Sequence, residues 1–468
     1  MQTRPSVPGN SWVDTEEVWR DHLAGQRAPV NSNGFGRLFL RVTLGLTLLT
    51  TVALWWSGTM AQPLANTAAI IGAAGRICGM LGGYLLLLQI LLVSRVAWVE
   101  RWIGPHDLRV WHRRLGAAVF VLVLGHVALA IVGYAVQQRW PVAHATWSMF
   151  TTYEDILSAL IAAGVLVAIA LLATWTVRRA MPYEMWHFLH LGGYLTLVLG
   201  YGHQFATGRD LRAGVGRWYW AGLYAFVICC LIGGRIVSPL VLNLRHRLRV
   251  LDVRRESVDT VSLYVSGRRL HELPARAGQY FRWRFLSWGC WWQSHPFSLS
   301  AAPNGEWLRL TVKRVGGHTS KLAVVRPGTR VFAEGPAGAF TAHQQVKPKA
   351  LLIAGGSGIA PVRALLEELP RDTILIYRAS TPDEVVFQRE LDWLAHERGA
   401  KVWYVLGSRY DPWPRHVLSQ RGLRELVPDV RRRDVYLCGP QGLTASSLNA
   451  LERLGVPRRQ IHVDRFEL

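Results

Sequence analysis

The 468-residue sequence has few cysteines and few acidic residues for its length. Its five cysteines form no CxxC pair, which excludes a disulfide framework and the usual zinc-ligand spacing. Acidic residues number 31 against 53 lysines and arginines, a net charge of +22. No nucleic-acid motif with interleaved aromatics accompanies this charge, so the expected anionic partner is a lipid bilayer. The N-terminal region lacks an apolar run before residue 38, and no cleavable signal peptide is expected.

Half of the residues are hydrophobic, and the long apolar segments crowd the first half of the chain. These segments predict six membrane-spanning helices, at roughly 38–56, 70–94, 112–135, 155–176, 186–206 and 217–241. Arginines gather in the connection 95–114, at 178–179 and after residue 244. By the positive-inside rule, the N-terminus and the C-terminal half are cytoplasmic. The sequence thus predicts a multi-pass protein, and the short loops favour a bacterial inner (plasma) membrane.

Two of the predicted spans carry a histidine toward each end. His112 and His126 are 14 residues apart in one span, and His190 and His203 are 13 apart in another. An isolated histidine in a span more often bonds to a neighbouring helix, but four with similar separations indicate a shared function. Imidazole is a common axial haem ligand. The pattern predicts two six-coordinate haems, one between His112 and His190 and one between His126 and His203.

The second histidine pair departs from ideal helical spacing. Thirteen residues make about 3.6 turns, which would place His190 and His203 on different sides of a regular helix. His187 is an alternative ligand, although its spacing to His203 fits no better. An irregularity near the glycines of 192–202 is therefore expected. Arg76, inside the second span, also needs a partner: a haem propionate, an outer acceptor, or the interface by snorkelling.

The pattern changes after the last span. Alternating runs over about 246–345 predict an antiparallel β-barrel. From 348, buried strands alternate with helical runs, as in a doubly wound parallel sheet. In Gly355-Gly356-Ser357-Gly358 the glycines would let a diphosphate approach the backbone at a helix N-terminus. Cys438-Gly439-Pro440 ends a later strand on the same sheet edge, where such sheets bind ligands.

These motifs, in this order, resemble the ferredoxin–NADP reductase-like module. The residues that carry the resemblance are His295-Pro296-Phe297-Ser298-Leu299-Ser300, Gly317-His318-Thr319-Ser320, Gly355-Gly356-Ser357-Gly358, Cys438-Gly439-Pro440 and Phe466. With the paired histidines ahead of the module, residues 38–468 resemble the ferric reductase and NADPH oxidase superfamily of flavocytochromes b. The resemblance implies FAD and two haems b as cofactors, with NADPH as the electron donor.

The resemblance also implies roles for single residues on the flavin side. Phe297 would pack on the flavin ring, and Ser298 would bond near its reactive nitrogen. The neighbouring cofactor-binding residues would be His295, Pro296, Gly317, Thr319 and Ser320, of which Thr319 and Ser320 hold the FAD diphosphate. Phe466 would cover the flavin until the nicotinamide displaces it. Ordinary core packing is the alternative for Phe297 and Phe466.

On the nicotinamide side, the resemblance implies that Gly355, Gly356 and Gly358 bind the diphosphate of the coenzyme. Cys438, followed by Gly439 and Pro440, would lie beside the nicotinamide, with an inert buried thiol as the alternative. Cys438, Phe466 and Ser298 would be the catalytic residues. Arg378, Ser408 and Arg409 follow the second and third strands and suit the 2′-phosphate of NADPH. Asp383 and Glu384 lie near enough in sequence to leave NADH as the alternative.

The sequence predicts a multi-domain membrane protein. Its parts are an N-terminal cytoplasmic segment (1–36), a six-helix transmembrane haem-binding bundle (37–243), an antiparallel β-barrel FAD domain (244–345) and an α/β doubly wound nicotinamide-binding domain (346–468). It would pass electrons from cytoplasmic NADPH through FAD and two haems to an outer acceptor, a ferric chelate or O2. An electron relay that donates to a periplasmic redox protein is the alternative, and the short outer loops weigh against it.

Overall fold

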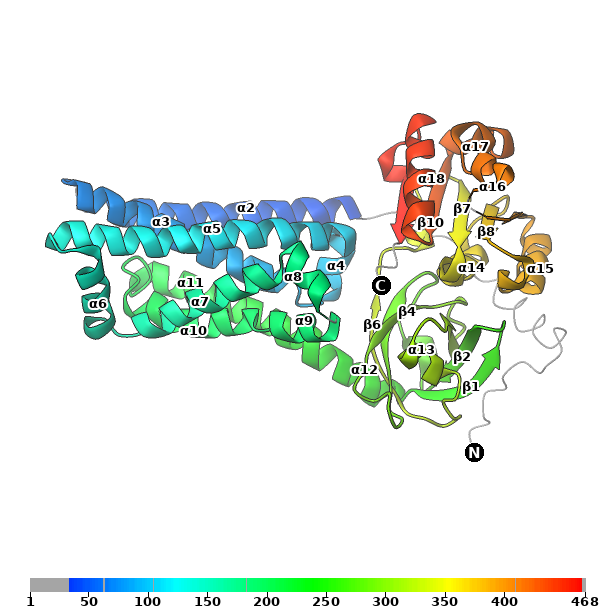
Figure 1. Ribbon diagram of the computed structural model, residues 1–468, viewed down its shortest axis with the longest axis horizontal. Coiled ribbons are helices and arrows are strands. Elements are labelled where there is room, and N and C mark those ends of the chain that lie inside the picture. The colour runs from blue at the N-terminus through cyan, green and yellow to red at the C-terminus, as the bar shows by residue number, and fades with distance from the viewer. Residues whose placement is uncertain (1–32, 62–63, 104, 182, 409, 465–468) are drawn as a thin grey trace. The chain divides into compact units, whose positions relative to one another are not determined.

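The structure, a computed structural model, describes residues 33–61, 64–103, 105–181, 183–408 and 410–464. These residues divide into a helical unit, Asn33–Val237, and a second unit that begins at Ser238 (Figure 1). Most of the predicted N-terminal segment lies outside the described residues, as do Arg409 and Phe466.

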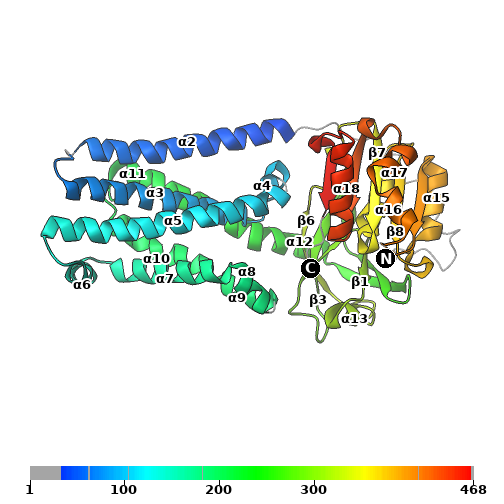
Figure 2. The same cartoon turned by 45° about the horizontal axis from the view of Figure 1, so that its top comes forward.

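The helical unit is a bundle of long apolar helices with shorter ones between them. In chain order it contains α2 (Asn33–Met60), α3 (Thr67–Leu92), α4 (Ala97–Ile103), α5 (Pro105–Gln138), α6 (Val142–Thr152), α7 (Ile156–Leu172), α8 (Trp175–Ala180), α9 (Tyr183–His190), α10 (Gly193–Ala206), α11 (Gly214–Ile232) and the π-helix η1 (Gly233–Val237). Figures 1 and 2 show α2, α3 and α5 side by side. A Cβ on Gly75 would stand 3.3 Å from the Cβ of Leu129, so glycine lets α3 and α5 approach closely.

The number of membrane spans differs from the sequence prediction. Four helical segments of the described chain are long and apolar enough to cross a membrane: Phe35–Met60, Thr67–Leu92, Asp107–Gln138 and Gly214–His246. Helices α6 and α7, bent by 117° at their break, make a fifth if counted as one span. The predicted span 186–206 is not one continuous helix, because the chain turns at Leu191 and Gly192 between α9 and α10. Residues 142–152, expected in a loop, form α6.

The second unit begins with helix α12 (Ser238–His246) and two small antiparallel sheets. One sheet has the order β1-β2-β5, formed by Arg249–Arg255, Thr260–Ser266 and Trp307–Lys313; the other has the order β4-β3-β6, formed by His295–Ser298, Tyr280–Phe285 and Val331–Ala337. Isolated bridges at Arg249–Arg330 and Leu299–Leu310 join further backbone segments to these strands. Inward side chains such as Phe281 and Trp283 fill the shared core. The antiparallel pairing is confirmed, and the strands predicted as a barrel form two three-stranded sheets that these bridges join at both edges.

The C-terminal part confirms the predicted doubly wound parallel sheet. Its five strands have the order β11-β10-β7-β8-β9, formed by Ile461–Asp464, Arg433–Cys438, Lys349–Gly355, Ile374–Ala379 and Lys401–Leu406. Helices α14 (Ile359–Glu368) and α15 (Gln388–Arg398) pack on one face; α16 (Pro412–Val417), α17 (Gln420–Leu426) and α18 (Gln441–Arg453) pack on the other. The strand order reverses between β7 and β10, which marks the expected ligand-binding crevice.

Candidate functional site

The four histidines of the sequence prediction lie in two pairs within the helical unit. The ring centroids of His112 and His190 are 6.1 Å apart, and those of His126 and His203 are 6.3 Å apart. The first member of each pair lies on α5, while His190 ends α9 and His203 lies in α10. The pairing is the one that the sequence predicted.

The break between α9 and α10 explains how a 13-residue spacing is accommodated. The backbone N–H of Gly192 donates to the carbonyl of Leu189, and the chain turns before α10 starts at Gly193. The helical phase therefore changes between His190 and His203, as the irregularity expected near Gly192 requires. His187 also lies on α9, but the ring contact of His112 is with His190.

The surroundings of His126 fix its ring and its tautomer. Its Nδ1 lies 2.8 Å from the carbonyl oxygen of Gly75. Because a carbonyl only accepts, Nδ1 carries the hydrogen and Nε2 keeps its lone pair for a ligand bond. A Cβ on Gly79 would stand 2.7 Å from this Nδ1, so glycine is required where α3 passes the ring. Neither glycine carries a sequence signal that separates it from the other small residues of α3.

The ring of His190 is oriented by an aromatic neighbour. Trp186 stacks on it with centroids 5.0 Å apart and an interplanar angle of 19°, and the guanidinium of Arg178 lies 5.1 Å from the Trp186 ring centroid. The Nδ1 atoms of His112, His190 and His203 are buried and make no hydrogen bond of acceptable geometry among the described residues. Each of these rings therefore has a buried nitrogen whose hydrogen-bonding capacity is not used with acceptable geometry within the described chain.

Within each pair, the distance between the two ring centroids is the one expected if both rings bind the same metal ion. An iron bound at about 2 Å by one nitrogen of each ring would separate the centroids by about 6 Å. No cluster of three or more His, Cys, Asp or Glu in the described chain could hold a metal by protein ligands alone. Each pair could supply two imidazole nitrogens to an iron whose remaining donors come from a macrocycle such as porphyrin. The residues fit a bis-imidazole haem at both positions.

Arg76 finds a protein partner that the sequence prediction did not consider. Its Nε lies 3.3 Å from a carboxylate oxygen of Asp210, and its Nη2 donates to Thr59 at 3.0 Å. The Asp210 side chain is only 4% exposed. The first partner of Arg76 is therefore a carboxylate from the α10–α11 connection. Asp210, the acidic residue in the connection 204–217, was the available signal.

In the second unit, the predicted flavin motif forms strand β4 and its end. The hydroxyl of Ser298 is buried and has no hydrogen-bond partner among the described residues. The Phe297 ring stacks on His295 with centroids 6.1 Å apart, while its backbone carbonyl accepts a hydrogen bond from the Trp283 indole. Pro296 is exposed on the same strand. A buried hydroxyl without a partner on this strand could donate a hydrogen bond to a flavin.

The next flavin motif lies in helix α13 (Gly317–Leu322). The Thr319 hydroxyl oxygen accepts from the backbone N–H groups of Val315 and Gly316 at 3.0 Å, which fixes the preceding turn. Ser320 is exposed. Gly317 begins the helix, so the predicted diphosphate residues lie together on one short segment.

The nicotinamide motifs meet at the crevice between β7 and β10. A Cβ on Gly358 would collide with the carbonyl group of Cys438, so only glycine lets these two loops touch. Gly356 has φ +54°, a conformation that glycine adopts without strain. A cleft of about 780 Å³ opens here, and its lining includes Gly355, Gly356 and Pro440. The structure thus brings the two predicted motifs to one ligand-sized cavity.

Cys438 is fully buried at the end of β10. Burial raises the pKa of its thiol well above the ordinary value of 9.0, and the Asp464 carboxylate adds to this effect. The group is therefore a neutral thiol at physiological pH and not a thiolate nucleophile.

Two of the residues predicted for the coenzyme 2′-phosphate, Arg378 and Ser408, lie among the described residues. The Arg378 guanidinium lines the cleft but donates to the backbone carbonyls of Ala379, Val405 and Gly407. The Ser408 backbone N–H donates to the Asp411 carboxylate at 2.6 Å. Two arginines that the sequence did not single out, Arg415 on α16 and Arg453 on α18, line the cleft together with Arg378. Their convergence depends on the packing of α16 and α18, which no local pattern reveals.

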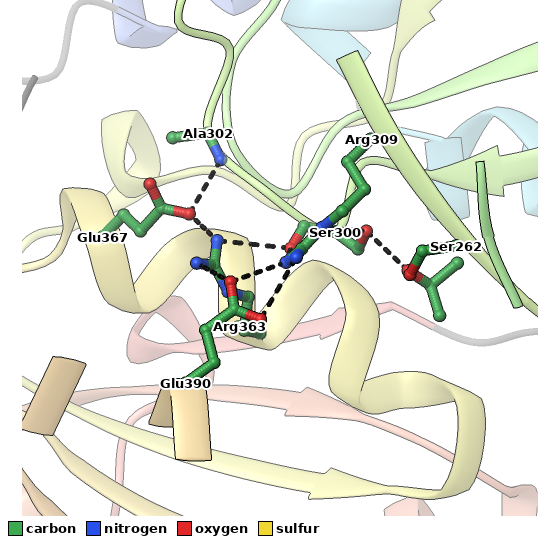
Figure 3. Close-up of polar contacts among 8 residues, drawn as sticks. Ser262, Ser300, Ala302, Arg309, Arg363, Glu367 and Glu390 are labelled. Atoms are coloured by element: carbon green, nitrogen blue, oxygen red, sulfur yellow. Dashed lines mark hydrogen bonds and ion pairs between the residues drawn. The ribbon is translucent and has the colours of Figure 1, made fainter. Parts of the chain in front are cut away.

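A buried ionic network joins the antiparallel sheets to the parallel-sheet domain (Figure 3). Arg309 on β5 donates to the Ser300 carbonyl at 2.6 Å and to Glu390 on α15 at 3.1 Å. Arg363 on α14 forms ion pairs with Glu367 and Glu390. Burial opposes the charge of Arg309, but the Glu390 carboxylate raises the pKa of this guanidinium. The network fixes the segment that follows Ser298 against helices α14 and α15.

Three family matches cover most of the described chain. Residues 78–201 match the ferric reductase-like transmembrane component, residues 245–341 a FAD-binding domain and residues 352–448 an oxidoreductase NAD-binding domain. An NADPH oxidoreductase of Mycobacterium tuberculosis is 30% identical over 258 residues, which cover 50% of this chain and 67% of that protein. A flavohemoprotein of Chromobacterium violaceum is 30% identical over 257 residues, which cover 47% of this chain and 59% of that protein.

Among solved structures, the flavohem-like FAD/NAD-binding domain of nitric oxide dioxygenase from Vibrio cholerae is 26% identical. That match has a TM-score of 0.40 and covers 47% of this chain and 98% of the other. For the two relatives above, the matched region spans between 59% and 67% of their own length. The family matches give the chain a membrane-type helical region followed by a FAD- and NAD-binding reductase module.

Proposed function

Because the chain belongs to the ferric reductase and NADPH oxidase superfamily, we propose that it is a flavocytochrome b. In this proposal, it transfers electrons from NADPH, by way of FAD and two haems b, to an acceptor across the membrane. The acceptor is a ferric chelate or O2. The observation that carries the proposal is the separation of the histidine pairs, 6.1 and 6.3 Å between ring centroids.

His112 with His190 and His126 with His203 would be the axial ligands. Haem with two imidazole ligands supplies reversible one-electron chemistry and has no open iron position. The protein residues orient the ligands: Gly75 holds the Nδ1 hydrogen of His126, and Trp186 stacks on His190. Gly79 leaves the space that the His126 ring needs.

The proposed topology has six crossings. The four long segments of the described chain would be completed by α7 and by the α9–α10 pair, whose break places His190 and His203. The basic connections 95–114 and 178–179 favour a cytoplasmic location for those ends, for the N-terminus and for the reductase module. The proposed boundaries remain 37–243 for the membrane domain, 244–345 for the FAD domain and 346–468 for the nicotinamide domain.

FAD would lie on strand β4 and helix α13. FAD accepts a hydride and gives up single electrons, which links a two-electron donor to one-electron acceptors. Ser298 offers it a buried unbonded hydroxyl, and Phe297 offers an aromatic face. Thr319 and Ser320 would hold the diphosphate, and Phe466 would cover the flavin ring. Cys438, as a neutral thiol, would pack beside the nicotinamide without exchanging a proton.

NADPH would occupy the cleft over Gly356. Arg415 and Arg453 favour NADPH over NADH, because arginine binds the oxygens of a phosphate with paired donors and only NADPH carries the 2′-phosphate. Arg378 would stabilise the loops around the phosphate, since its own donors bond to backbone carbonyls. Glu384 also lines the cleft and is the residue that would favour NADH. Replacing Arg415 with alanine should lower kcat/KM for NADPH more than for NADH, whereas Arg421→Ala on the exposed face of α17 should change neither.

Haem content tests the proposal directly. His126→Ala and His203→Ala should each remove one of the two haems, read from the pyridine haemochrome of purified protein. His187→Ala, on the same helix as His190, is the matched control and should retain both. Full haem content in all of the ligand variants would refute the assignment.

An anaerobic reaction identifies the acceptor. NADPH should reduce the haem absorption bands of the purified protein, after which oxygen or ferric citrate is added and the reoxidation rates are compared. Faster reoxidation by ferric citrate makes metal reduction the function, and faster reoxidation by oxygen with superoxide release makes it an oxidase. Haem that NADPH never reduces would contradict the proposed electron path.

A further inference from the structure

The connection between β3 and β4, Leu286–Ser294, exposes three tryptophans. Trp288 is 98% exposed, Trp291 59% and Trp292 55%. We call this segment the tryptophan loop. Large apolar side chains grouped on a surface usually mark a binding site, since exposing them to water is unfavourable.

The tryptophan loop is held in a defined shape by its backbone. The N–H groups of Cys290 and Trp291 both donate to the carbonyl of Ser287, at 3.1 and 3.2 Å. The Cys290 side chain is 1% exposed and anchors the loop in the core of the antiparallel domain. Leu286 pairs its N–H with the Arg330 carbonyl at 2.9 Å. The tryptophans are thus turned outward by an anchored loop.

The chain connection puts this domain next to a bilayer. A candidate membrane span runs to His246, and strand β1 begins at Arg249. Asn243 near the end of that helix both donates to and accepts from the backbone of Ala333 on β6, at 2.8 and 2.9 Å. The domain that carries the tryptophan loop is therefore bonded to the last turns of a membrane helix.

The charge of the domain matches an anionic lipid surface. Residues 238–341 contain 16 lysines and arginines against six aspartates and glutamates, a net charge of +10. One of these cations lies at the loop itself: the Lys321 ammonium is 3.3 Å from the position that a Cβ on Gly289 would take. Basic side chains near an anionic leaflet are attracted to it.

We propose that the tryptophan loop is a membrane-interface anchor, with its indoles in the headgroup region of an anionic bilayer. Tryptophan suits this region because its ring is apolar while its N–H bonds to polar headgroups. Lys321 would contact lipid phosphates beside it. Because β4 follows the loop directly, the anchor would hold His295–Ser298 at the membrane surface. The inference does not depend on the proposed electron transfer.

Lipid quenching of a fluorophore on the full-length protein tests the anchor. A bimane label is attached to a Ser287→Cys variant in which Cys78, Cys229 and Cys230 are replaced by alanine, and the protein is placed in nanodiscs. We expect brominated phosphatidylglycerol to remove more than half of the label's fluorescence. The control carries the same label on Val258→Cys, an exposed position in a turn. The next residue, Asp259, lines a pocket with Gly356 and Ser357 of the parallel-sheet part, so this label should lie away from lipid and keep its fluorescence.

Further measurements distinguish a lipid contact of the tryptophan loop from exposure to water and from a protein contact. Replacing Trp288, Trp291 and Trp292 together with serine should abolish the fluorescence difference between unbrominated and brominated phosphatidylglycerol, and brominated phosphatidylcholine should quench less than brominated phosphatidylglycerol. A label quenched by aqueous iodide but not by the lipid would overturn the proposal. A label protected from both would assign the loop to a protein contact and overturn it equally. If Ser287→Cys does not fold by circular dichroism, the label is moved to Trp288→Cys.

Discussion

The two units differ in how the buried polar groups are hydrogen-bonded. In the second unit, Arg309, Arg363 and Glu390 form ion pairs or hydrogen bonds with one another and with Ser300. In the helical unit, histidine rings stand about 6 Å apart, and three of their Nδ1 atoms are unbonded. Buried groups that satisfy one another hold a fold together, whereas groups left apart and unbonded indicate a site for a ligand.

The largest effect is expected from breaking the network. Glu390→Ala leaves two buried guanidinium groups without their shared carboxylate, which typically costs about 3–5 kcal/mol of unfolding free energy. The chemical denaturation midpoint of the full-length protein measures it. Glu425→Ala removes the exposed partner of Arg421 and should leave the midpoint unchanged. Equal effects of the two variants would contradict the structural role of the network.

The ion pair of the helical unit should matter less. Asp210→Asn keeps the shape of the side chain but removes the charge beside Arg76, which remains hydrogen-bonded to Thr59. We expect a loss of about 1–3 kcal/mol, the cost of an incompletely paired buried group. Thermal unfolding in nanodiscs checks the value. A loss as large as that of Glu390→Ala would mean that both units depend equally on buried ion pairs.

A single methyl group tests the space around the histidine rings. Gly79→Ala places a Cβ against the His126 ring, and overpacking of this kind costs about 1–3 kcal/mol. It should also lower the content of the haem proposed at His126 and His203. Gly72→Ala is the matched control on the same helix, since its added Cβ meets nothing within 4 Å. Equal haem content in the two variants would argue against a ligand role for His126.

The smallest expected effect is a pH dependence of the unfolding free energy, caused by the Glu368 carboxyl in the second unit. Burial raises the pKa of the Glu368 carboxyl above its ordinary value of 4.5, although the Ala277 N–H bonds to it. A carboxyl group whose pKa is raised in the folded state contributes to stability at low pH. This contribution is lost as the pH rises through the folded-state pKa. Glu368→Gln should therefore gain stability relative to the native chain between pH 4.5 and neutrality. A constant difference across these denaturation measurements would refute the shift.

Periodicity in the sequence predicted what depends on neighbours along the chain. Alternating and buried runs gave the antiparallel strands and the parallel sheet, and histidine spacing predicted which rings meet. Hydropathy measures length and apolarity rather than helix continuity, so the break at Leu191 and Gly192 was indicated only by the 13-residue spacing of His190 and His203. Asp210 against Arg76, and Arg415 with Arg453 around the cleft, depend on how distant helices pack. The sequence marks Asp210 as the acidic residue of its connection, but no local pattern identifies the partner that it meets.

The core of the second unit crosses the boundary drawn at 345. Ala277, Ala302 and Phe340 from the antiparallel part are buried in one cluster with Leu365 and Leu391 from the parallel-sheet part. Residues 346–468 made alone would expose the apolar faces that those side chains cover. The two parts are therefore expected to unfold together in one melting transition, and a chain cut between them is expected to aggregate.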